Sequence, residues 1–162
     1  FHTLRIHING NVAIAFLVFC SLLFYGWWNP PYLLLLVGSI LLNYYFASKL
    51  FENHRKKYLV SAITINLLIL GYFKYMDFFI QNINLIYDNN FNLLNIALPL
   101  AISFFTFQQI AYLVDVYNNK TNEHKLLNYA IFVSFFPQLV AGPIIYHKEV
   151  KSQYANLHLP KL

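Results

Sequence analysis

The chain has 162 residues, of which 59% are hydrophobic and only 10% are charged, values outside ordinary soluble usage. Together with a positive mean hydropathy, they predict an integral membrane protein. The net charge of +5 would suggest a nucleic-acid partner in a soluble protein, but here the basic residues stand in short loops between apolar runs. We therefore expect no nucleic-acid partner. The single cysteine, Cys20, excludes an internal disulfide and a cysteine-rich metal site.

The first two predicted membrane spans cover residues 12–28 and 32–47. The first span ends in Trp27 and Trp28, an interfacial aromatic pair, and an Asn-Pro-Pro turn follows that a regular helix would not continue through. Both spans are slightly short for a hydrocarbon core of about 30 Å, which takes ~20 residues, so we expect flanking aromatic side chains to complete them. The pattern predicts a tight helical hairpin.

Charge orients the next two spans. The loop at residues 48–57 carries a cluster of basic residues and one glutamate, and clusters of this kind are retained in the cytoplasm. A third span, 58–76, therefore leads outward to a polar segment, 77–95, that contains no Lys or Arg. The fourth span, 96–117, returns inward, with Pro99 near its first turn, where a missing N–H is harmless. Lysines follow it, as expected for a cytoplasmic loop.

The last apolar run, residues 126–145, is predicted to be broken. Its start already lies on the cytoplasmic side, yet the lysines after it also look cytoplasmic. Pro137 within the run would break a regular helix at a cost of about 3 kcal/mol, and Gly142 and Pro143 end it. A re-entrant segment resolves this conflict, and a kinked fifth span is the alternative. The fold class we expect is an all-α, polytopic transmembrane helical bundle that forms one membrane domain over residues 1–162.

Polar residues inside the apolar runs mark the candidate site, because lipid would exclude them and a protein interior or a wet cavity would hold them. At about 100° per residue, Gln108, Tyr112 and Asp115 share one face of the fourth span, which should point into the protein. For Asp115 the alternative is an interfacial carboxylate that is solvated or bonded to a neighbouring helix. His147, directly after the broken run, has a structural or solvated role as its alternative. No pair of histidines has metal-ligand spacing, so we expect no metal site.

Three stretches carry a family resemblance. LPLAISFFTFQQIAYLVDVY (98–117), NYAIFVSFFPQLVAGPI (128–144) and HKEVKSQY (147–154) resemble the membrane-bound O-acyltransferase family, in the branch that contains the alginate O-acetyltransferase membrane subunit. SLLFYGWWNP (21–30) is similar to the opening segment of that branch. The resemblance covers nearly the whole chain, in the same order. The D-alanyl transfer protein of teichoic acid synthesis and the peptidoglycan O-acetyltransferases share a similar core, so the reaction class is better specified than the polysaccharide.

The resemblance implies many membrane helices with re-entrant pieces around a tunnel. It implies transfer of an acyl group, expected to be acetyl, from a cytoplasmic donor to a hydroxyl of an extracytoplasmic polysaccharide such as alginate or a cell-wall glycan. The expected donor is acetyl-CoA or another acyl carrier, with no tightly bound cofactor. A periplasmic or extracellular transferase partner, surrounding membrane lipids and a multi-pass location in a bacterial cytoplasmic membrane are also implied.

The resemblance places the catalytic histidine in a later part of the family's chain. Nothing between Phe1 and Leu162 matches its setting, so we assign no catalytic residue, do not transfer the role to His147, and expect an N-terminal fragment that is inactive alone. A noncatalytic membrane scaffold and a transporter or flippase are the alternatives. The positions of the matching motifs assign the tunnel wall and donor entrance to Gln108, Gln109, Tyr112, Asp115, Gln138 and His147. They assign backbone shape to Pro99, Pro137, Gly142 and Pro143.

Overall fold

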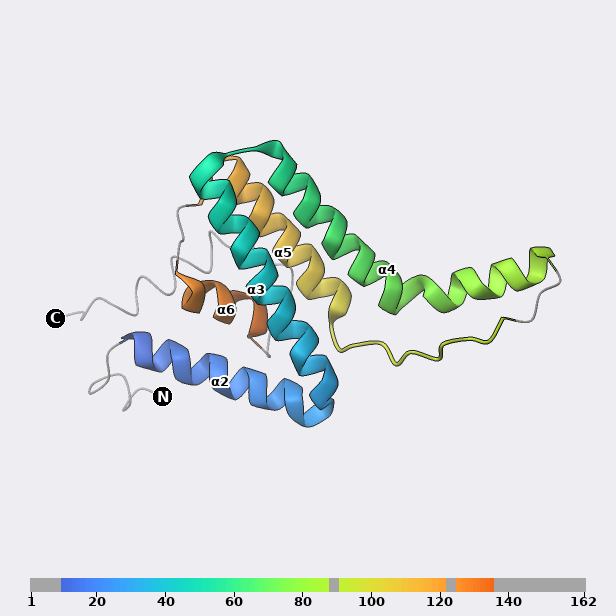
Figure 1. Ribbon diagram of the computed structural model, residues 1–162. Helices are drawn as coiled ribbons and strands as arrows, with labels where there is room; N and C mark the ends of the chain where they lie inside the picture. Colours follow the sequence, from blue (N-terminus) through green and yellow to red (C-terminus); the bar gives the residue numbers. More distant parts are fainter. Residues whose placement is uncertain (1–9, 88–90, 122–124, 136–162) are drawn as a thin grey trace.

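The computed structural model describes residues 10–87, 91–121 and 125–135, and every regular element in these ranges is an α-helix (Figure 1). The prediction of an all-α fold is confirmed. By length and composition, α2, α3 and α4 could each cross a membrane. In chain order the helices are α2 (Gly10–Trp28), α3 (Pro30–Asn53), α4 (Lys56–Tyr87), α5 (Ile102–Tyr117) and α6 (Leu126–Ser134).

Prolines set the start of two helices. α3 begins at Pro30, directly after the cap residue Asn29, because the fixed φ of proline suits a first helical turn and its missing N–H is not needed there. α5 begins later than the sequence predicts, at Ile102 instead of residue 96. Pro99 consequently lies in the turn before the helix, where its carbonyl accepts a hydrogen bond from the Ile102 N–H at 3.3 Å.

α4 is longer than the predicted third span. It continues through Met76, where the span was expected to end, to Tyr87. The added stretch contains Asp, Asn and Gln residues, and for this reason the sequence predicts a polar segment there. Apolar residues nevertheless recur among them at helical spacing. The polar segment expected at 77–95 is therefore helical in its first half, and Figure 1 shows that α4 bends before entering it.

The first two helices meet at a tight turn but do not form the predicted hairpin. The Asn29 N–H donates to the Tyr25 carbonyl at 3.3 Å. A Cβ at Gly26 would lie 3.0 Å from Leu33 Cδ2, a close contact that a small shift of the Leu33 side chain would relieve. From this turn α2 and α3 diverge, and α6 packs against both of them (Figure 1). α2 thus packs against both α3 and α6.

A buried amide cluster joins α3, α4 and α5. It consists of Ser39, Asn43, Asn66 and Gln109, all buried. The Asn43 amide nitrogen donates to Asn66 Oδ1 at 3.1 Å and to Gln109 Oε1 at 2.6 Å, and Asn66 Nδ2 donates back to Asn43 Oδ1 at 2.6 Å. Gln109 Nε2 completes the cluster by donating to Ser39 Oγ at 3.1 Å. Because a buried amide without partners costs about 1–3 kcal/mol, the cluster fixes how the three helices are rotated against one another.

Two tyrosines from the α2–α3 region hold the segment that leads into α5. The Tyr25 hydroxyl donates to the Leu100 carbonyl at 3.0 Å, and the Tyr32 hydroxyl donates to the Ala97 carbonyl. Ala101 then takes a left-handed conformation, with φ of 56°, immediately before the helix begins. These bonds fix the position of the first residues of α5 relative to α2 and α3.

A ring contact holds the other end of α5. His54, which ends α3 in a left-handed conformation, stacks on Tyr117 with ring centroids 5.0 Å apart and an interplanar angle of 8°. The basic residues 55–57 follow His54 directly, and Lys120 follows the end of α5. Basic residues from two loops therefore gather at the same end of the bundle.

Replacing Asn43 by alanine should destabilise the protein, because Asn66 would lose two buried hydrogen bonds and Gln109 one. We expect the free energy of unfolding to fall by about 2 kcal/mol, measured as a lower unfolding temperature of the full-length protein in detergent. Asn82→Ala is the matched control, since among the described residues the Asn82 amide bonds only the Phe78 carbonyl of its own helix. Equal unfolding temperatures for the two variants would contradict a stabilising role for the cluster.

Candidate functional site at the α5–α6 seam

The polar residues of α5 lie in different surroundings. Gln108, Gln109 and Tyr112 are buried, so the predicted inward orientation of Gln108 and Tyr112 is confirmed. Asp115 is half-buried near the end of the helix, and its carboxylate has no hydrogen-bond or ion-pair partner within the described ranges. This placement fits both alternatives for Asp115, the interfacial carboxylate and the wall of a polar passage.

The two adjacent glutamines face different helices. Gln109 turns toward α3 and α4, where both ends of its amide bond within the amide cluster. Gln108, about 100° further round the helix, turns toward α6, and its Nε2 donates to the Phe132 carbonyl at 2.9 Å. In this structure Gln109 therefore holds helices together, whereas Gln108 faces the seam between α5 and α6.

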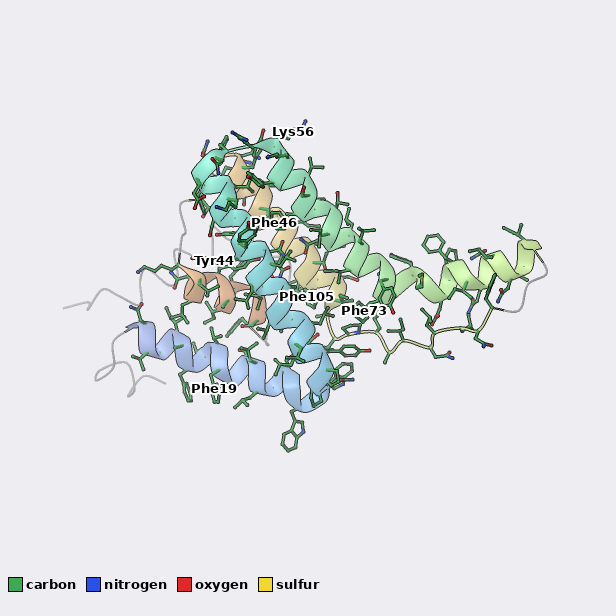
Figure 2. The ribbon with its side chains drawn as sticks, in the orientation of Figure 1. Phe19, Tyr44, Phe46, Lys56, Phe73 and Phe105 are labelled. Atoms are coloured by element: carbon green, nitrogen blue, oxygen red, sulfur yellow. The ribbon has the colours of Figure 1, made fainter. Side chains whose placement is uncertain are left out.

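Three tyrosine rings in mutual contact lie beside Gln108, between α3, α5 and α6. Tyr129 of α6 is fully buried between two other tyrosines. Its ring centroid lies 4.5 Å from that of Tyr112 on α5 and 6.3 Å from that of Tyr44 on α3. Figure 2 shows Tyr44 at the point where α3 passes α6. Tyr129 was not predicted from the sequence, although a tyrosine in the apolar run NYAIFVS was a visible signal for a polar contact.

Three buried polar atoms at this seam have no hydrogen-bond partner among the described residues. They are Gln108 Oε1, the Tyr129 hydroxyl and Ser134 Oγ. Gln108 bonds the Phe132 carbonyl, and Tyr129 and Ser134 stand three residues before and two residues after Phe132 on α6. We call Gln108, Tyr112, Tyr129 and Ser134 the α5–α6 seam.

The free atoms limit what the α5–α6 seam can bind. The Gln108 Nε2 already donates to the Phe132 carbonyl. The free Gln108 Oε1 is an acceptor, so the partner of this oxygen must be a donor. The hydroxyls of Tyr129 and Ser134 can both donate and accept. Water or a hydroxyl-bearing group satisfies all three, and buried groups of this kind are normally satisfied in native proteins.

Several predicted site residues lie outside the described ranges. These are Gln138 and His147 of the predicted site, together with the predicted backbone positions Pro137, Gly142 and Pro143. Their roles, and the choice between a re-entrant and a spanning segment at 126–145, stay predictions. Among the described residues, no cluster of three or more His, Cys, Asp or Glu side chains could hold a metal ion.

Comparisons with known proteins give several full-length relatives. The chain is 44% identical to a peptidoglycan O-acetyltransferase of Helicobacter pylori, over 86% of this chain and 32% of the relative. It is 36% identical to a probable alginate O-acetylase of Pseudomonas aeruginosa and 35% identical to one of Pseudomonas putida, over 85% and 86% of this chain. The chain thus spans about a third of the length of the curated relatives it matches. No family model and no solved structure matches it.

Tyr129→Phe should leave the stability of the full-length protein unchanged or raise it, because the lost hydroxyl makes no hydrogen bond with any residue that the structure describes. Tyr25→Phe is the matched control, since it removes a buried hydroxyl that bonds the Leu100 carbonyl, and should cost about 1 kcal/mol. Thermal unfolding in detergent measures both. A Tyr129→Phe variant as unstable as Tyr25→Phe would mean that the Tyr129 hydroxyl has a fixed structural partner.

Proposed function

Because this chain belongs to the membrane-bound O-acyltransferase family, in the branch that contains the alginate O-acetylases, we propose that the whole protein transfers acetyl groups across a membrane to the hydroxyls of a polysaccharide. Relatives named for peptidoglycan and for alginate support the shared reaction and leave the acceptor as a hydroxyl-bearing glycan. A transporter or a noncatalytic scaffold has no such support, because the curated relatives are named for acetyl transfer.

We propose that the donor, acetyl-CoA or another acyl carrier, approaches the end of the bundle where His54 stacks on Tyr117. The basic residues 55–57 and Lys120 at that end support a cytoplasmic location, since positive loops are retained in the cytoplasm. The acceptor, or a periplasmic or extracellular partner that passes the acetyl group on, would then meet the opposite end. This orientation corresponds to a location in a bacterial cytoplasmic membrane.

The observation that carries the proposal for this part of the protein is the contrast between two sets of buried polar residues. The amide cluster bonds within itself and holds the helices, whereas the α5–α6 seam leaves three polar atoms free. Unsatisfied buried groups are costly and are kept mainly where they serve a function. We therefore assign the seam to the wall of the passage through which a reacting group or its water moves.

Tyr129→Phe and Ser134→Ala test this assignment in the full-length gene, expressed in cells that lack their own copy. Each variant removes only a free hydroxyl, so we expect O-acetylation of the polysaccharide to fall about tenfold at unchanged protein level, which corresponds to about 1.4 kcal/mol of lost interaction. Acetate released by mild alkali from purified polysaccharide gives the measurement.

Phe107→Ala is the control for this experiment. Phe107 neighbours Gln108 on α5 but is exposed, so acetylation should not change. Wild-type acetylation in both hydroxyl variants would reduce the seam to ordinary packing, while the family's reaction would still stand.

A further inference from the structure

The distal part of α4 forms an arm outside the helix bundle. We call residues 75–87 of α4 and the returning segment 91–98 the distal arm. Figure 1 shows it projecting away from α3 and α5 after the bend in α4. α4 has 32 residues, about 48 Å at 1.5 Å per residue, whereas a hydrocarbon core is about 30 Å thick. The helix is thus too long to lie wholly within one crossing along the membrane normal.

The bend lies at the level of an aromatic group at the ends of α2 and α3. Phe73, labelled just before the bend in Figure 2, packs edge-on against Tyr32 with ring centroids 6.0 Å apart. Tyr32 in turn stacks on Trp28 at 6.3 Å, and the neighbouring Trp27 is 92% exposed. Tryptophan and tyrosine concentrate where hydrocarbon meets the lipid headgroups. A bend at this level lets α4 leave the hydrocarbon core and continue along the membrane surface.

The arm uses its polar side chains to bind its own returning segment. Asp77 Oδ1 accepts a hydrogen bond from the Leu94 N–H at 2.8 Å. Asn84 bonds both backbone groups of Phe91, with its Nδ2 donating to the carbonyl at 2.9 Å and its Oδ1 accepting from the N–H at 3.0 Å. Backbone without regular structure can face lipid only where such partners exist. These bonds satisfy three backbone groups of the returning segment and hold it against the polar face of the arm's helix.

The opposite face of the arm's helix is exposed and is apolar apart from Asn82, whose amide donates to the Phe78 carbonyl. At about 100° per residue its large side chains fill roughly half the circumference, and two of them, Leu85 and Ile86, are 83% and 73% exposed. Residues 75–98 contain no Lys or Arg. The exposed side chains of this apolar face are Tyr75, Met76, Phe78, Phe79, Ile83, Leu85 and Ile86.

We propose that the distal arm lies along the non-cytoplasmic surface of the membrane, with its apolar face in lipid. Continuity with a membrane-crossing helix places the arm at the bilayer, and an amphipathic helix binds there by burying its apolar face. Another membrane helix would pack less well than lipid against this face. Residues 75–87 contain no Gly, Ala, Ser or Thr, the small residues through which membrane helices pack closely. The arm acts as a surface anchor that fixes the depth of α4.

Spin labels can test this in the full-length protein, reconstituted in vesicles of phosphatidylethanolamine and phosphatidylglycerol. A cysteine is placed singly at Leu85, Ile86, Asp77 or Asn84, on a background in which Cys20 and any other cysteine are replaced by serine. Collision with oxygen reports lipid, and collision with a water-soluble nickel chelate reports water. Leu68, 67% exposed before the bend, is the lipid control, and the exposed Glu52 is the water control.

Labels at Leu85 and Ile86 should behave like a label at Leu68. Their ratio of oxygen to nickel collision rates should be at least three times the ratio measured at Glu52. A label at Asp77 or Asn84 should collide less with oxygen, which gives a helical period along the arm. High nickel collision at Leu85 and Ile86 would place the apolar face in water and overturn the proposal. Low collision with both reagents would mean that protein covers this face, and would overturn it equally.

Discussion

The hydrogen bonds among Ser39, Asn43, Asn66 and Gln109 are the interaction on which the rest of the structure depends. In an apolar interior, packing of similar aliphatic surfaces specifies helix rotation only weakly, whereas amide groups must find partners of fixed geometry. Once Gln109 is bound to α3, its neighbour Gln108 must turn toward α6. The amide cluster thereby determines which polar atoms the α5–α6 seam presents.

The two adjacent buried glutamines of α5, Gln108 and Gln109, differ in their hydrogen bonding. On α5, one glutamine is fully bonded and its neighbour keeps a free acceptor, although both are buried. Exposure alone would not separate them, and neither would the residue type. The distinction lies in the donors and acceptors around each amide. It separates a residue that stabilises the bundle from one whose amide oxygen lacks a donor among the described residues.

Much of this fold could be predicted from the sequence, because it depends on local signals. Apolar runs predicted the helices, the Asn-Pro-Pro sequence predicted the break between α2 and α3, and spacing placed Gln108 and Tyr112 on a buried face. The pairing of Asn43 with Asn66, 23 positions apart, could not be predicted in this way, because it depends on the angle at which two helices cross. The position of Tyr129 between α3 and α5, and of α6 beside α2, depends on the same tertiary geometry.

The pairing of Asn43 with Asn66 has a consequence for biogenesis. Their amides bond each other directly, in both directions, without any residue of α5. The α3–α4 pair can therefore leave the insertion machinery as a unit whose polar groups are already partly neutralised, before α5 has been synthesised. Gln109 then enters a prepared position, and the order of synthesis matches the order in which these buried bonds become available.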